Sequence, residues 1–245
     1  MRGIMRIYLL DILRGLSVLA MIFYHFFWDL GYFNFIELES MTQGLPLMFA
    51  QLVGASFIII SGISLRLMCI SDNFLAKFFK RIGVLIFVCT VITSVTFYFD
   101  KNSYIFFGVL HLLATCSVIG LLFSRVRSNY IIFFFFFLSL IVSLSEITFN
   151  LPHYLSWLGL NKEVPITNDF YPLFPWVTFY LFGLWVYQPF KSYLVPNKKK
   201  NNPDLSDYNS IFRILQFLGR NSLTVYILHQ PIFFSLFFIF IKLTS

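Results

Sequence analysis

Long runs of apolar residues, separated by short polar segments, dominate the sequence. A helix of about 20 apolar residues spans a bilayer, and runs of roughly this length lie at residues 8–30, 46–68, 82–99, 104–123, 130–149, 171–189 and 221–241. The pattern predicts an all-α fold, a polytopic membrane helix bundle with about seven transmembrane helices. Prolines near the later spans leave six or eight spans open, and the sequence HYLSWLGL between residues 150 and 170 predicts a short interfacial helix.

The positions of lysine and arginine predict how these spans are oriented, because cytoplasmic loops carry an excess of both residues. With the N-terminus in the cytoplasm and the C-terminus outside, the outer segments hold only Lys101, Lys162 and Lys242. Arg14 lies inside the first span, and all other lysines and arginines fall on the cytoplasmic side. The net charge of +7 therefore reflects membrane topology, and no nucleic-acid partner is expected.

Composition excludes a soluble globular protein. The chain is 58% hydrophobic and 12% charged, and its mean hydropathy is +0.79. Its longest polar stretch, from Lys191 to about Asn209, is predicted to be a loop, so residues 1–245 are expected to form a single transmembrane domain. The three cysteines form no CxxC pair and the four histidines are scattered, so neither a disulfide framework nor a metal site is expected.

The first predicted span carries ionisable side chains inside an otherwise apolar run. Arg14 and His25 are eleven positions apart, so at about 100° per residue they lie within about 20° of one helix face, about 16 Å apart along the axis. Asp11 lies one turn before the arginine, and Asp29 lies one turn after the histidine. Because charged groups in hydrocarbon are costly, this polar stripe is expected to face protein or a wet cavity.

The stripe has a structural and a functional interpretation. Structurally, Asp11 and Arg14 form an ion pair near the inner interface, while His25 makes a hydrogen bond between helices. Functionally, the same groups line a polar cavity and bind or transform a substrate. The first span alone leaves both interpretations open.

Polar side chains in three other segments favour the interpretation in which the stripe lines a polar cavity. Gly108, His111 and Thr115 share one face at positions i, i+3 and i+7, and Asp169 lies beside two prolines at the predicted outer mouth of the sixth span. The last span has a polar side close to a proline, formed by Ser222, Tyr226, His229, Gln230 and Pro231. Irregular helices at membrane depth are tolerated where they line a cavity or pack inside protein.

Five blocks of sequence, in order, carry a resemblance to a known family. They are RGLSVLAMIFYHFFWDL, FIIISGISL, FFGVLH, DFYPLFPWVTFYLFG and LGRNSLTVYILHQP. Between about residues 6 and 235 the chain resembles bacterial membrane proteins that share the catalytic domain of heparan-alpha-glucosaminide N-acetyltransferase. An arginine, ten residues and then a histidine in the first span is also the signature of the wider transmembrane acyltransferase superfamily.

The resemblance implies an acyl-CoA-dependent transmembrane O- or N-acyltransferase in the bacterial cytoplasmic (inner) membrane. It would move an acyl group, usually acetyl, from cytoplasmic acetyl-CoA or another acyl-CoA to an acceptor, typically a sugar or glycan, on the outer side. Acyl-CoA, the glycan acceptor and membrane lipids are the implied partners, no metal is implied, and a homo-oligomer is left open.

Residue roles follow from the same resemblance. His25 would act as a general base or as a transient acyl carrier, Asp29 would hold its tautomer, and Arg14 would bind a phosphate or carbonyl oxygen of the donor. Asp169 would orient the acceptor or a histidine. The remaining expected contacts of the donor site are Tyr226, His229 and Ser222.

One departure from the family affects the catalytic histidine. In lysosomal members that histidine lies in the segment just after the first span, and here the segment GYFNFIELESMTQG contains none. The role passes to His25 through the wider superfamily, and His111 is its rival. Direct transfer without an acyl-enzyme stays open. Two other functions also stay open: a secondary transporter that binds an anionic or protonatable substrate through Arg14 and the intramembrane histidines, and a purely structural role.

Overall fold

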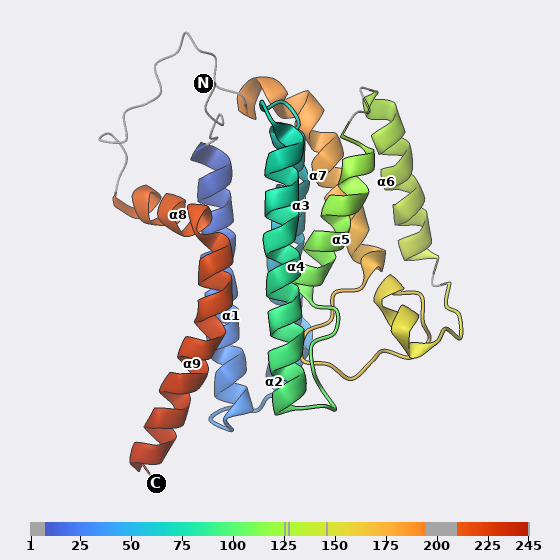
Figure 1. The fold of residues 1–245 in the computed structure, drawn as a ribbon. Helices are drawn as coiled ribbons and strands as arrows, with labels where there is room; N and C mark the ends of the chain where they lie inside the picture. The colour runs from blue at the N-terminus through green and yellow to red at the C-terminus, as the bar shows by residue number, and fades with distance from the viewer. Residues whose placement is uncertain (1–7, 125, 127, 146, 195–209, 245) are drawn as a thin grey trace. The chain divides into compact units, whose positions relative to one another are not determined.

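The computed structural model describes residues 8–124, 126, 128–145, 147–194 and 210–244. These residues fold into helices joined by turns and irregular segments, and their only β structure is two isolated bridges. The elements in chain order are α1 (Tyr8–Tyr32), α2 (Glu39–Thr42), α3 (Gly44–Met68), α4 (Phe74–Phe99), α5 (Val109–Leu122), α6 (Asn129–Leu144), the 3-10 helix η1 (His153–Leu158), α7 (Leu173–Leu194), α8 (Ser210–Arg220) and α9 (Ser222–Thr244) (Figure 1). The predicted all-α class is confirmed.

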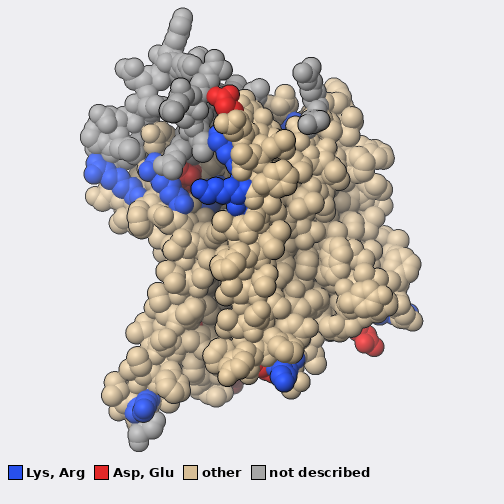
Figure 2. All heavy atoms as spheres, viewed as in Figure 1, with Lys and Arg blue, Asp and Glu red and all other residues tan. Residues whose placement is uncertain are grey.

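Four of the described helices are long and apolar enough to cross a membrane, namely α1, α3, α4 and α9. The apolar helices α5 and α6 are shorter, with 14 and 16 residues. Figure 2 shows that most side chains on the visible surface are neither Lys, Arg, Asp nor Glu, as lipid contact requires. The chain is thus an integral membrane protein, while the seven spans and the positions of the termini stay predictions.

Each predicted span contains one observed helix, although several boundaries moved. Helix α4 begins at Phe74, eight positions before the predicted start, so Lys77, Lys80 and Arg81 belong to its first two turns and not to a loop. Lysine and arginine are good helix formers whose long stems cover apolar surface, which explains the extension. The short helix predicted near HYLSWLGL is present as η1.

Prolines affect the last two long helices differently. Phe174, which precedes Pro175, has non-helical angles (φ −94°, ψ 132°) within α7, because a proline clashes with a helical residue before it. Helix α9 instead continues through Pro231.

The contacts between residues divide the chain into two compact units. Unit 1 contains the described residues of Ile58–Lys191, and unit 2 contains those of Met5–Phe57 and Ser192–Ser245. Helix α3 contributes residues to both units. Whether the chain acts as the single domain that its sequence predicts stays a prediction.

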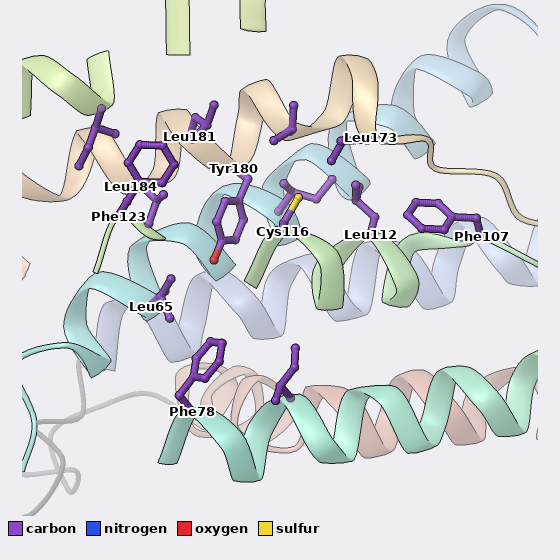
Figure 3. Close-up of a cluster of buried hydrophobic side chains, with 14 residues drawn as sticks. Leu65, Phe78, Phe107, Leu112, Cys116, Phe123, Leu173, Tyr180, Leu181 and Leu184 are labelled. Atoms are coloured by element: carbon purple, nitrogen blue, oxygen red, sulfur yellow. The ribbon is translucent and has the colours of Figure 1, made fainter. Parts of the chain in front are cut away.

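Unit 1 has a dense apolar core formed by parts of α3, α4, α5 and α7 (Figure 3). Two glycines let α3 and α7 approach closely, since a Cβ on Gly62 would lie 2.5 Å from the Tyr180 carbonyl oxygen and one on Gly183 would lie 2.3 Å from that of Ile59. Buried Arg66 donates from Nη1 to the carbonyls of Phe123 (3.2 Å) and Val126 (3.1 Å), just beyond α5. A cation there complements the negative end of the α5 dipole.

Unit 2 is built around α1, which packs against α8 and α9 (Figure 1). Helix α8 crosses α1 at two glycines: a Cβ on Gly15 would lie 1.8 Å from the Leu215 carbonyl oxygen, and one on Gly219 would lie 1.8 Å from that of Asp11. The Ser17 and Ser56 hydroxyls, 2.8 Å apart, join α1 to the first part of α3. Small residues of this kind are typical of helix crossings in membrane proteins.

The predicted stripe on α1 lies on its protein-facing side. Val18, Met21 and Asp29 are buried, with exposed fractions of 0%, 5% and 0%. Leu16 and Phe23, on the opposite side, are 53% and 60% exposed. The polar face of the first span is therefore turned toward the protein, as the cost of charge in lipid requires.

Candidate active site

Asp29 and Gln230 connect the outer half of α1 to α9. The Gln230 Nε2 amide donates to Asp29 Oδ1 at 2.7 Å, and the Asp29 side chain is fully buried. The bond joins residues 201 positions apart in the sequence. Asp29 was predicted to hold the tautomer of His25, and the structure instead records Gln230 as its hydrogen-bond partner.

The same pair of helices brings two histidines together. The ring centroids of His25 on α1 and His229 on α9 are 4.9 Å apart. His229 Nδ1 lies 2.6 Å from the Tyr226 carbonyl oxygen, so Nδ1 carries a proton and donates it, because a carbonyl only accepts. In the neutral ring this leaves Nε2 as a hydrogen-bond acceptor.

The cluster of His25, Asp29, His229 and Gln230, hereafter the α1/α9 cluster, contains polar atoms that no described residue satisfies. The unpaired buried atoms are His25 Nδ1, Asp29 Oδ2, His229 Nε2 and Gln230 Oε1. An unsatisfied buried polar group costs about 1–3 kcal/mol. Unsatisfied groups gathered in one place, two of them imidazoles, are typical of a site that binds or transforms a polar molecule.

Arg14 lies near the other end of α1 in a group of three charges. Arg14 Nη1 is 3.5 Å from Asp11 Oδ1, and Arg220 Nε, at the end of α8, is 3.5 Å from Asp11 Oδ2. The ion pair of the structural interpretation is therefore present. Asp11 therefore lies between two guanidiniums, one from α1 and one from the end of α8.

His111 is the third residue of α5 in unit 1, and both of its ring nitrogens have hydrogen-bond partners. The Gly108 backbone N–H donates to His111 Nδ1 at 3.3 Å, which caps the N-terminus of α5. His111 Nε2 lies 3.1 Å from Thr93 Oγ1, and this hydroxyl donates to the Ile105 carbonyl at 2.8 Å. The network assigns the Nε2–H tautomer to His111, so no lone pair of the ring is available without breaking the cap.

Asp169 also binds the start of α5. Its Oδ2 accepts the Val109 backbone N–H at 3.1 Å, where a carboxylate is favoured by the helix dipole. Burial raises the pKa of the Asp169 carboxyl to about 6, and the Val109 N–H opposes this rise. A Cβ on Gly108 would lie 2.1 Å from Asp169 Oδ2, so a larger residue here would have to displace the Asp169 carboxyl group.

A hollow of about 380 Å³ opens between α4 and α5. His111 and Thr115 both line it, which agrees with the prediction that they share one face of the helix. Thr90, Thr93 and Ser94 of α4 face the same space. The other predicted donor contacts lie at the start of α9: Ser222 is its first residue, and Tyr226 supplies the carbonyl that binds His229.

Two contacts of these sites were not predicted. Arg220 was predicted only to lie in a cytoplasmic segment, and Thr93 was not considered. A single threonine in an apolar span does not by itself indicate which residue it contacts. Arg220 ends a helix that the apolar-length criterion missed because α8 has only 11 residues. Among the described residues no three His, Cys, Asp or Glu side chains group closely enough to hold a metal.

The fold and the α1/α9 cluster define an integral membrane protein with a buried histidine site on its first long helix. The model of the family described as heparan-alpha-glucosaminide N-acetyltransferase, catalytic, matches residues 6–231, so the chain belongs to that family. Membership implies a membrane acyltransferase with an acyl donor and a glycan acceptor in general. No curated protein and no solved structure matches the chain significantly.

Proposed function

We propose that this protein transfers an acetyl group from cytoplasmic acetyl-CoA to a hydroxyl or amine of a sugar or glycan on the outer side of a bacterial inner membrane. Family membership supports the transfer of an acyl group. The bias of lysine and arginine supports a cytoplasmic N-terminus, a C-terminus outside and about seven spans. This orientation places Arg14 toward the cytoplasmic donor and His25 toward the outer acceptor.

The observation that carries the proposal is the pair of imidazoles in the α1/α9 cluster, 4.9 Å apart. In direct transfer, His25 takes the proton of the acceptor O–H or N–H as the oxygen or nitrogen forms a bond to the thioester carbon. The carbon–sulfur bond then breaks, and the CoA thiolate receives the proton from the histidine. A transient acyl-imidazole on His25 would divide the same exchange into two steps.

Arg14 would act at the donor end of α1. Its planar guanidinium can bind a phosphate or carbonyl oxygen through paired N–H groups. Arg220, which also contacts Asp11, brings a second guanidinium to this end of α1. Val18 and Met21 lie between Arg14 and His25 on the protein-facing side of α1, where both are buried. The pantetheine chain would pass along this apolar stretch.

Acetyl transfer by the purified protein in detergent tests the proposal. With radiolabelled acetyl-CoA and glucosamine as the probe acceptor, the wild type should release CoA and label the sugar. His25→Gln should lower kcat/KM by about 100-fold or more, the range of general-base contributions. The matched control is His153→Gln in η1, which removes an exposed histidine and should keep the wild-type rate. Equal activity of His25→Gln and the wild type would rule out a catalytic His25.

A further inference from the structure

The unpaired atoms of the α1/α9 cluster share one chemical property. An amide oxygen (Gln230 Oε1) only accepts hydrogen bonds, and so does the unpaired oxygen Asp29 Oδ2 when the carboxyl group is ionised. His229 Nε2 is an acceptor as well, because Nδ1 carries the proton that is donated to the Tyr226 carbonyl. The fourth atom, His25 Nδ1, can accept in one of its two tautomers. With Asp29 ionised and His25 protonated at Nε2, all four unpaired atoms are acceptors, and the cluster lacks hydrogen-bond donors.

This polarity distinguishes between the two substrates of the proposed reaction. A thioester carbonyl and a phosphate bring further acceptors, and a phosphate would also be repelled by Asp29. A sugar presents several O–H groups, and an amino sugar adds N–H groups, each of which can donate to an unpaired atom. The described residues place no Lys or Arg in an ion pair with Asp29, so a cationic amine would also supply the missing charge.

We infer that Asp29, Gln230 and His229 form the binding site for the sugar acceptor, which they recognise through its hydroxyl and amino groups. This inference rests on the proposed function and changes one predicted role, since His229 then contacts the acceptor and not the acyl donor. The Asp29–Gln230 hydrogen bond engages Oδ1 and leaves Oδ2 without a partner among the described residues, so Oδ2 is the oxygen that the sugar would contact.

The position of Asp29 gives the site a function in catalysis. Asp29 follows His25 by four residues, which is about one helical turn or 6 Å. A sugar bound to Asp29, Gln230 and His229 would place a neighbouring hydroxyl or amine at His25. Asp29 and Gln230 act as specificity residues and His25 as the base, so their variants should affect different kinetic constants.

Binding and turnover of glucosamine test the inference with Asp29→Asn and Gln230→Leu. Asn removes the charge and Leu removes the amide, and each should raise both the Kd and the KM for glucosamine by about tenfold or more, the effect expected for a hydrogen bond to a charged group. The KM for acetyl-CoA should stay within about twofold of the wild-type value in both variants. Glucose, which lacks the amine, should show a smaller loss with Asp29→Asn.

Tyr24→Phe is the matched control because Tyr24 neighbours His25 but donates its hydroxyl to the Met41 carbonyl, outside the cluster. It should leave the KM for glucosamine unchanged. The inference is overturned if Asp29→Asn and Gln230→Leu leave glucosamine binding unchanged, or if they raise the KM for acetyl-CoA instead. Failure of the proposed function would look different: the wild type would bind glucosamine in an Asp29-dependent manner but transfer no acetyl group.

Discussion

His25 is half-buried beside a second imidazole, one helical turn from a buried carboxyl group that lacks an ionic partner among the described residues. Helix packing alone would not select this combination, since each unpaired atom costs free energy that an apolar side chain would avoid. The arrangement is understandable if the groups are satisfied by a substrate during turnover. Arg14 is different, because Asp11 accompanies it as an ion pair.

His111 should behave as a structural residue. His111→Ala removes the acceptor for the Gly108 N–H, so we expect the free energy of unfolding to fall by about 1 kcal/mol, as for the loss of an N-cap. The kcat of the folded fraction should be unchanged. Thermal unfolding in detergent, together with activity per folded molecule, measures both effects. A large loss of kcat at unchanged stability would instead identify His111 as the catalytic base.

The raised pKa of the Asp169 carboxyl group should make the free energy of unfolding depend on pH. Its pKa of about 6 exceeds the ordinary value of 3.8, so the folded state holds the proton more tightly than the unfolded state. The contribution to stability is therefore complete below about pH 4 and is lost as the pH rises through 6, by up to about 3 kcal/mol. Asp169→Asn should remove this dependence.

Thermal unfolding of the wild type and of Asp169→Asn between pH 4.5 and 7.5 provides the measurement. The difference in melting temperature between the two proteins should change in favour of the variant as the pH rises. Parallel curves would show that Asp169 does not titrate in this range.

The sequence predicted which residues of a helix share a face better than it predicted their hydrogen-bond partners on other helices. The polar stripe of α1 follows from helical spacing, and the structure confirms that this face is turned toward the protein. The pairing of Asp29 with Gln230 depends on the register of two helices that are distant in the sequence, which the spacing within one helix does not determine. His111 was an ambiguous candidate for the same reason, since its partners Thr93 and Gly108 come from α4 and from the turn before α5.

At the scale of elements, the crossing of α1 and α8 shapes the end of unit 2 that contains Arg14. Helix α8 was not predicted because it is short and mixes apolar residues with Arg213, Gln216 and Arg220. Its close approach to α1 through Gly15 and Gly219 brings Arg220 to Asp11. The crossing thus forms the charged group in which Arg14 lies.

Adding a single methyl group at this crossing should disturb it strongly. Gly15→Ala would place Cβ 1.8 Å from the Leu215 backbone, which cannot move as a flexible side chain can. We expect a loss of stability of about 1–3 kcal/mol and weaker binding of acetyl-CoA, because Arg220 and Arg14 would shift. Thermal unfolding and the KM for acetyl-CoA measure these effects.

Gly83→Ala is the control for this substitution. Gly83 lies within α4 with nothing within 4 Å of the added Cβ, so alanine should stabilise the helix by about 0.5–1 kcal/mol. If Gly15→Ala were as stable as Gly83→Ala, α1 and α8 would not pack as closely as described.

At the scale of the whole molecule, the proposed reaction is vectorial. Apolar periodicity and composition were sufficient to predict an all-α membrane protein, because long apolar helices have few alternatives in a bilayer. They did not resolve the number of spans, since α5 and α6 are shorter than a bilayer requires. The prolines near the start of α7 also leave the first residue of that span undetermined by the sequence. The orientation rests on the positions of lysine and arginine.

Acetyl transfer across a sealed membrane tests vectorial catalysis at His25 most directly. Vesicles reconstituted with the cytoplasmic face outward would hold glucosamine inside and receive radiolabelled acetyl-CoA outside. We expect labelled, acetylated glucosamine to accumulate inside with the wild type and with His153→Gln, and not with His25→Gln. Product that forms only when both substrates are on the same side, or that forms equally with His25→Gln, would contradict a transmembrane transfer that depends on this histidine.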